Sequence, residues 1–234
     1  MSVVEAKTIA PVGFFADMPE DLRRKLREIA TEKTFGKGEM IFYEGDESLG
    51  FYLLISGLIK IYKLSPEGKE QILQFIRPNE TFGEVVVFSG KAFPANAEAV
   101  KGSHVLLFPR KDFLNFIHRN PNVALTMLAI LSERLRRFTL QVENLSLKEV
   151  PGRLATYFLY LSRQEGKGDA FTLEISKGQL ASLLGTIPET LSRILARMKD
   201  QKIIEVDGNH IRLLDFSRLI SLSEGDKLTN DMNS

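Results

Sequence analysis

The sequence predicts an α+β protein in which an antiparallel β domain, a long helix and a winged helix-turn-helix follow one another. Short β-rich runs separated by Gly, Pro and acidic turns fill residues 35–108. Apolar residues then recur at heptad spacing over 124–145, and residues 176–215 show helix, glycine turn, helix and hairpin in that order. The order of these three patterns gives the fold class.

Composition excludes several classes of protein. The 234-residue chain has a formal net charge of +1, which argues against a nonspecific nucleic-acid coat or a polybasic membrane anchor. It contains no cysteine, so disulfides, thiolate metal sites and cysteine-bound iron–sulfur clusters are excluded. The N-terminal sequence MSVVEAKTIAPVGFF lacks a signal pattern, and no apolar run approaches a membrane span. We expect a soluble cytoplasmic protein.

The β domain is best defined by FYLLISGLIKIYKL, residues 51–64, which alternates after Ser56-Gly57. Lys60 and Tyr62 fall on one face of this strand, and Ile59 and Ile61 on the other. SPEGKE supplies a turn, QILQFI begins the next strand, and further runs follow at intervals typical of a sandwich or barrel.

The pattern changes at Pro121, where a sustained heptad seam begins and polar residues such as Glu133 and Arg134 fill the remaining surface. One interpretation is a long helix packed against its own domain. The 3.5-residue period over three heptads favours a partner helix instead, so we predict a homodimer. The seam residues are Ala124, Leu128, Leu131, Leu135, Phe138, Val142 and Leu145.

The C-terminal third predicts a DNA-binding domain. VPGRLATYFLYLSRQ is an amphipathic helix, EGKGDAF a loop, and SKGQLASLLG a short helix closed by Gly185. TIPETLSRILARM is the next helix, and Asp207-Gly208 marks a hairpin. This order is that of a winged helix-turn-helix, in which the second helix enters the major groove of DNA.

Glu189, Ser192 and Arg193 share one face in the first two turns of that second helix. Arginine can contact guanine O6 and N7, and glutamate can accept from cytosine N4. An exposed Glu189–Arg193 ion pair, worth ~0.3–0.5 kcal/mol, is the plainer alternative. Thr186 and Glu189 also have the spacing of a capping box. Because the stretch lies between a glycine turn and a hairpin, we favour base reading.

The chain resembles the cyclic-AMP receptor protein/fumarate–nitrate regulator (Crp/Fnr) family of bacterial transcription factors over nearly its whole length. The matching segments are FYLLISGLIKIY, FGEVVVF, NPNVALTML and PETLSRIL. ISGLIKIYKLSPEGKEQIL, ENLSLK and IPETLSRI are most similar to the nitric-oxide-responsive, dissimilatory nitrate respiration branch. The resemblance implies an N-terminal antiparallel β-roll, a double-stranded jelly roll like that of cyclic-nucleotide-binding domains.

The resemblance also implies roles for single residues. Glu189, Ser192 and Arg193 would read bases, and Pro188 and Ser192 match the type whose half-site is TTGA rather than GTGA. Lys177 and Thr190 are expected to contact DNA phosphates. The implied effector pocket comprises Gly83, Glu84, Val85, Phe93, Asn96 and Phe138.

Cyclic AMP is not the expected ligand. Nucleotide-binding members hold the phosphate with an arginine followed by serine or threonine, and these positions fall on Phe93 and Pro94. The polar pair that contacts adenine falls on Phe138 and Thr139. The pocket is therefore expected to persist in an apolar form.

The resemblance to the nitric-oxide-responsive branch leaves haem as one candidate cofactor, because that branch is suspected of sensing nitric oxide through haem. A haem needs an axial ligand, usually His, Met or Cys. His104, His118 and His210 share no motif, and each reads more readily as a surface or interface histidine. Met127 lies on the long helix at a spacing usual for core filler.

Two rival functions are disfavoured. A cupin-like metal enzyme needs a cluster of His and carboxylate ligands, which three scattered histidines do not supply, so no enzyme is expected. A cyclic-nucleotide-type module that binds a partner protein instead of DNA is disfavoured by the helix-turn-helix. The sequence thus predicts an effector-sensing β-roll at 14–119, a dimerisation helix at 120–147, a DNA-binding domain at 150–222 and a disordered tail at 223–234. Double-stranded DNA, a second copy and RNA polymerase, in activation, are the partners that the resemblance implies.

Overall fold

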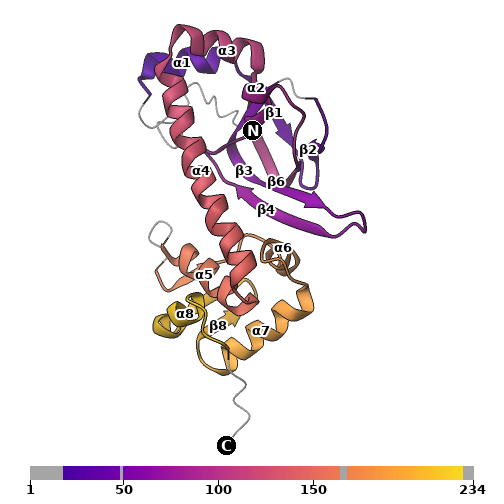
Figure 1. Ribbon diagram of the computed structural model, residues 1–234, viewed down its shortest axis with the longest axis vertical. Helices are drawn as coiled ribbons and strands as arrows, with labels where there is room; N and C mark the ends of the chain where they lie inside the picture. The colour runs from indigo at the N-terminus through magenta and orange to yellow at the C-terminus, as the bar shows by residue number, and fades with distance from the viewer. Residues whose placement is uncertain (1–17, 48–49, 164–167, 229–234) are drawn as a thin grey trace, which may run out of the picture. The chain divides into compact units, whose positions relative to one another are not determined.

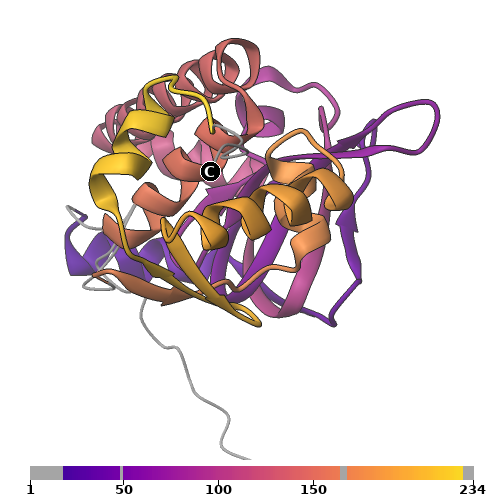
Figure 2. The same cartoon turned by 90° about the horizontal axis from the view of Figure 1, so that it is seen from below.

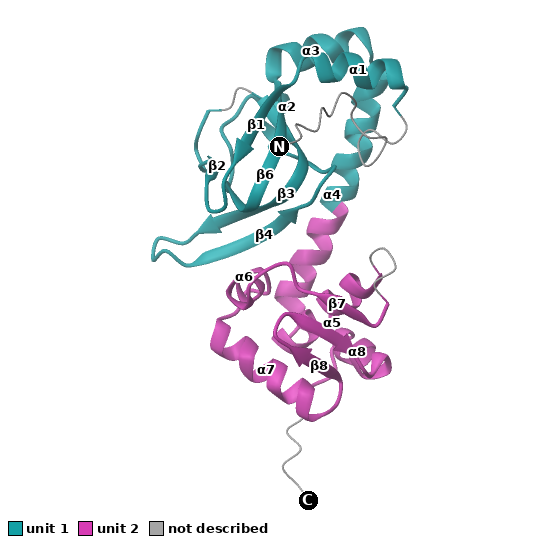
Figure 3. Ribbon diagram, turned by 180° about the vertical axis from the view of Figure 1, so that it is seen from behind, with its two compact units in different colours: residues 1–135 teal, residues 136–234 magenta. Residues whose placement is uncertain are grey.

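The computed structural model describes residues 18–47, 50–163 and 168–228 (Figure 1). The chain divides into two compact units, residues 1–135 and 136–234 (Figure 3). This division falls inside the long helix, whereas the sequence pattern sets the whole helix apart. The first part of that helix packs on the β domain, which is why it belongs to the first unit.

The first unit is built on a six-stranded antiparallel sheet with the order β1-β6-β3-β4, in which β2 also pairs with β6 and β5 with β3. The strand bounds are β1 Thr31–Phe35, β2 Met40–Phe42, β3 Gly50–Leu64, β4 Glu70–Ile76, β5 Thr81–Phe82 and β6 Asn96–Pro109. The predicted antiparallel β-roll is confirmed, and β3 and β4 are the strand pair expected around SPEGKE.

The register of β3 shifts near Ser56 and Gly57, where β3 passes β6. Gly57 has φ of 105°, and a Cβ at this position would lie 2.3 Å from Ser103 Oγ. Only glycine meets both conditions, because it alone adopts this conformation readily and leaves room for the neighbouring strand. Gly57 therefore lets β3 pass close to β6 at this point.

Both faces of β3 are buried after Gly57. Ile59 and Ile61 belong to the main core, and Lys60 is only 7% exposed. The Lys60 ammonium lies between the carboxylates of Glu70 on β4 and Glu98 on β6, at 3.1 Å from Glu98 Oε2. A buried lysine needs such partners, because an unpaired charge away from water is costly.

The charge of Lys60 is secured by these neighbours. Burial lowers the pKa of Lys60, but hydrogen bonds and charges from Glu70 and Glu98 outweigh it, so the pKa lies above its ordinary value. A raised lysine pKa contributes stability that is fully present below the unfolded value of about 10.4 and is lost as pH rises through the folded value. The cluster is therefore intact at neutral pH.

Helices cover the ends of the roll. Their bounds are α1 Glu20–Glu28, α2 Val85–Ser89, α3 Arg110–Arg119 and α4 Asn122–Leu147. Val123 and Met127 of α4 are buried in the core of the first unit, so Met127 is the core filler that its spacing suggested.

The second unit contains the predicted winged helix-turn-helix. Its elements are α5 Val150–Arg163, β7 Ala170–Thr172, α6 Lys177–Leu183, α7 Pro188–Asp200, β8 Ile204–Asp207, β9 His210–Leu213 and α8 Phe216–Ser223. The strands form a sheet in the order β7-β9-β8, and α7 lies beside β8 (Figure 2). Gly208, with φ of 58°, forms the expected hairpin turn.

Two details of the second unit differ from the sequence expectation. Part of the loop predicted at EGKGDAF forms β7, an edge strand that β9 orders by pairing with it. The tail predicted to be disordered from residue 223 instead makes defined contacts as far as Leu228, which is buried, and residues 229–234 lie outside the described part of the chain. No helix in the described ranges has the length and apolar character needed to cross a membrane.

Candidate DNA interface and sensory pocket

The helix-turn-helix is set by α6 and α7. Ser176 caps α6, because its Oγ accepts from Gln179 N at 3.2 Å while its own N–H donates to Gln179 Oε1 at 2.9 Å. This capping box was not predicted from the sequence, although the S-x-x-Q spacing is visible there. Gly185, with φ of 64°, turns the chain toward α7. Buried side chains hold the two helices together: Leu180, Ala181, Leu191, Ile194 and Leu195.

The capping box that the spacing of Thr186 and Glu189 would allow does not form. Pro188 is the first residue of α7, so Ile187 occupies the N-cap position and provides no side-chain hydrogen bond. Thr186 lies one residue too early, and its N–H donates to the Ala181 carbonyl at 2.9 Å. Glu189 is therefore not used to cap α7.

Glu189, Ser192 and Arg193 are exposed on α7. In the described part of the chain Glu189 and Arg193 do not form an ion pair, since Arg193 Nη2 donates to Thr190 Oγ1 at 3.2 Å. The plainer alternative for this pair is thus not what the geometry shows. Thr190 is half-buried, but its hydroxyl can still donate its own hydrogen to a phosphate. Lys177 is exposed at the start of α6.

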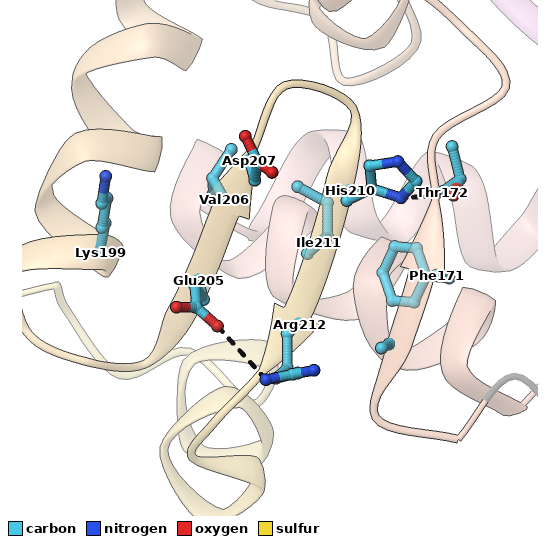
Figure 4. A pocket seen from close by; sticks show the side chains of 10 residues that line it. Phe171, Thr172, Lys199, Glu205, Val206, Asp207, His210, Ile211 and Arg212 are labelled. Carbon is cyan, nitrogen blue, oxygen red and sulfur yellow. Dashed lines mark hydrogen bonds and ion pairs between the residues drawn. The ribbon is translucent and has the colours of Figure 1, made fainter.

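A shallow hollow of about 660 Å³ lies over the β7-β9-β8 sheet (Figure 4). Lys199 of α7 lines it together with Glu205, Asp207 and Arg212. Arg212 Nη1 lies 3.6 Å from Glu205 Oε2, and both side chains are 59% exposed. Such an exposed pair adds little stability. His210, the wing histidine, is exposed and shares a hydrogen bond of 2.8 Å between its Nδ1 and Thr172 Oγ1.

In the first unit, the implied phosphate position is filled by aromatic rings. Phe93 is 3% exposed and stacks on Phe42, with ring centroids 3.6 Å apart and planes at 7°. Tyr52 and Phe82 stack at 5.1 Å beside them. A Cβ on Gly83 would lie 2.9 Å from the Phe93 ring, so the glycine makes room for this ring. Aromatic side chains of the roll thus fill the space around the implied phosphate position.

Glu84 is held by the long helix. Its Oε1 accepts from Arg134 Nη1 at 2.7 Å, and Arg134 Nη2 also donates to Thr81 Oγ1 at 3.1 Å and to the Thr81 carbonyl. The Glu84 side chain is 6% exposed and that of Arg134 is 14% exposed. The sequence pattern put Arg134 on the polar surface of α4, and the structure corrects this. A signal existed, because Val123, Met127, Ile130 and Arg134 form a second stripe at spacings of four, three and four.

The remaining implied pocket residues have different surroundings. Val85 is 43% exposed on α2. Asn96 is buried, and its Oδ1 accepts from Glu44 N at 3.0 Å while its Nδ2 donates to the Tyr62 carbonyl at 3.4 Å. Its side chain therefore binds two backbone groups of the roll. Phe138 belongs to the second unit and is 39% exposed.

The described residues do not fit a haem with a histidine ligand in the roll. His104 Nε2 lies 3.4 Å from Glu32 Oε2 on the β1–β6 pair, His118 is exposed on α3, and His210 is in the wing. Met127 is 2% exposed within the core, so its sulfur could reach a ligand only if the core opened. The described residues also contain no group of three or more His, Cys, Asp or Glu side chains placed to hold a metal ion.

The predicted seam lies along the exposed side of α4. Leu128, Leu135 and Val142, seven residues apart, are 59%, 68% and 63% exposed. This face is roughly a quarter turn from the stripe that packs on the roll. One helix therefore carries two adjacent stripes, and only one of them is covered within the described chain.

Known proteins match both units of the chain. A model of the cyclic nucleotide-binding domain matches residues 32–120, and a model of the Crp-like helix-turn-helix domain matches residues 152–222. The chain is 32% identical to the cyclic AMP receptor protein of Thermus thermophilus over 82% of this chain and 88% of that protein. It is 29% identical to the fumarate and nitrate reduction regulatory protein of Vibrio cholerae over 83% of this chain and 79% of that protein.

Among solved structures, FixK2 from Bradyrhizobium japonicum is similar with a TM-score of 0.76 and 28% identity, covering 85% of this chain and all (100%) of that one. Both units thus have matching counterparts in a single kind of protein. The chain belongs to the Crp/Fnr family of DNA-binding transcriptional regulators, and its N-terminal unit is a sensory domain of the cyclic-nucleotide-binding type.

Proposed function

We propose that the chain is a homodimeric regulator that reads a palindrome of TTGA-type half-sites, with RNA polymerase as a further partner in activation. The exposure of Glu189, Ser192 and Arg193 on one face of α7, without an ion pair between Glu189 and Arg193, carries this proposal. Arg193 reads guanine, Glu189 accepts from cytosine, and Ser192 helps to select thymine. The two half-sites lie about one helical turn of DNA apart, so that both recognition helices reach successive major grooves.

Replacing Arg193 with alanine should remove the guanine preference. The loss of a bidentate hydrogen bond to the base is expected to cost ~1–3 kcal/mol per half-site. Lys177→Ala serves as the matched control, because binding to a phosphate carries no sequence information. It should weaken all sequences alike and lower the salt slope by about 1 for each phosphate that the lysine no longer neutralises. The measurement is a base-substitution scan of binding at fixed salt. If Arg193→Ala keeps the full guanine preference, the base-reading role is refuted.

The signal that the first unit senses is not cyclic AMP in this proposal. The stacked Phe93 and Phe42 rings fill the implied phosphate position. The Glu84 carboxylate already accepts a hydrogen bond from Arg134. The nitric oxide response implied by the resemblance is not supported through a histidine-bound haem, so the proposal includes no haem.

Calorimetry with cyclic AMP at millimolar concentration should therefore show no heat of specific binding. A buried phosphodiester requires a paired cation and several donors, and Phe93 supplies none. Submicromolar binding that also tightened DNA affinity would overturn this prediction. A known cyclic-AMP-responsive relative, assayed in parallel, provides the positive control.

A further inference from the structure

The chain turns back after α8 and forms a short segment, Glu224–Leu228, that we name the C-terminal strap. Gly225, with φ of 116°, makes the turn possible. The Asp226 N–H then donates to the Ser221 carbonyl at 3.1 Å, and the Asp226 carboxylate accepts from Ser221 Oγ at 2.8 Å. The strap is thus fastened to the last turn of α8.

Arg218 of α8 binds the strap at two further points. Its Nη1 lies 3.2 Å from Asp226 Oδ2, and its Nη2 donates to the Lys227 carbonyl at 2.8 Å. A guanidinium presents several donors in a fixed fork, which suits two acceptors on one short segment. The Arg218 side chain is 30% exposed, so these bonds are partly shielded from water.

The far end of the strap reaches the recognition helix. The Leu228 side chain is 7% exposed, and its carbonyl oxygen accepts from Arg197 Nη2. Arg197 lies in the last turn of α7, four residues after Arg193. Its position on the recognition helix, one turn after Arg193, would suggest a contact with DNA. In the structure its guanidinium is half-buried and engaged by the strap.

We propose that the C-terminal strap positions the recognition helix for base reading and that Arg197 is a positioning residue, not a DNA contact. This inference rests on the proposed function. Burial of Leu195 and Met198 holds α7 on its domain, but the hydrophobic effect that drives this burial is non-directional. A directional bond from Arg197 restrains rotation of α7 about its own axis. Specific contacts need side chains held to within about 0.5 Å, so this restraint favours specific over nonspecific binding.

The test compares two shortened chains with the full chain. One ends at Gly225 and lacks the anchored part of the strap. The other ends at Asn230 and is the matched control, because it keeps the strap and leaves the Leu228 carbonyl within a peptide bond. We expect the chain ending at Gly225 to lose affinity for the TTGA palindrome by roughly ten-fold, as fits the loss of a hydrogen bond to a charged group. Affinity for unrelated DNA and the salt slope should stay unchanged, and the control should match the full chain.

Point variants keep the test independent of truncation. Arg197→Ala should reproduce the loss of specificity, and Arg197→Lys, which retains a donor, should restore part of it. If Arg197→Ala weakens specific and unrelated DNA alike and lowers the salt slope, Arg197 contacts phosphate and the proposal fails. An unchanged ratio of specific to unrelated binding, with only a lower melting temperature, would likewise refute positioning.

Amide hydrogen exchange of α7 without DNA separates this inference from the proposed function. We expect the amides at the end of α7 to lose protection in the chain ending at Gly225 and in Arg197→Ala, but not in the chain ending at Asn230. If the full chain fails to bind any TTGA palindrome, the proposed function fails, while the exchange result still reports whether the strap restrains the helix. Unchanged exchange in both variants would overturn the inference itself.

Discussion

Replacing Leu135 with glutamate is expected to convert the proposed dimer into monomers. Leu135 is 68% exposed and lies in the middle of the stripe formed by Leu128, Leu135 and Val142. In a pair of helices, residues at this heptad position face their counterparts, so each dimer would bury two like charges in an apolar seam. A monomer reaches only one half-site, and loss of the second should reduce affinity for the palindrome by about 10²–10⁴-fold.

Sedimentation at micromolar concentration measures this directly, with DNA binding as the second readout. Leu140→Glu is the matched control, because Leu140 is also on α4 and 54% exposed but lies on the side of the helix opposite the seam. That variant should remain a dimer. A Leu135→Glu protein that sediments as a dimer with unchanged affinity would disprove the seam. Dissociation of Leu140→Glu alone would place the interface on another face of α4.

Replacing Arg134 with methionine should destabilise the first unit by about 3–5 kcal/mol, because it leaves the Glu84 carboxylate buried without its cation. The Glu84 side chain is 6% exposed, so water cannot compensate for the loss. The Thr81 hydroxyl and carbonyl also lose their donor. Urea unfolding should show a lower midpoint, with an unchanged slope if the transition remains two-state.

Two further variants identify the cause. The double replacement Glu84→Gln with Arg134→Met removes both charges, and it should recover most of the lost stability because no unpaired ion remains. Arg136→Met, at an exposed position on the same helix, should change stability by less than about 0.5 kcal/mol. If Arg134→Met is as stable as Arg136→Met, the buried pair does not hold α4 on the roll.

Much of the fold could be predicted because its signals are local. The strand after Gly57, the long helix α4 and the Asp207-Gly208 turn each depend on residues close together in sequence, and each appears in the structure. The helix-turn-helix followed from the order of such elements. Errors of detail arose where an element depends on a distant partner, as β7 depends on β9.

The candidate site was less predictable than the fold. The residue types at Glu189, Ser192 and Arg193, and the periodicity that puts them on one face, come from the sequence alone. The sequence does not tell whether Arg193 pairs with Glu189, because side chains three or four residues apart can both meet on a helix. The structure shows Arg193 bound to Thr190, three residues before it.

The sequence by itself determined the order of elements and the apolar periodicity of α4, and it has Phe93 where the resemblance implies a phosphate-binding arginine. Only the tertiary structure decided where the charged side chains of Lys60, Arg134 and Arg197 go. Periodicity marks apolar faces, but it does not show which polar residue a fold will bury. That depends on an acceptor brought close by the chain's path, as with Arg134 and Glu84, which are 50 residues apart. A charge can be buried only where such a partner offsets the loss of water.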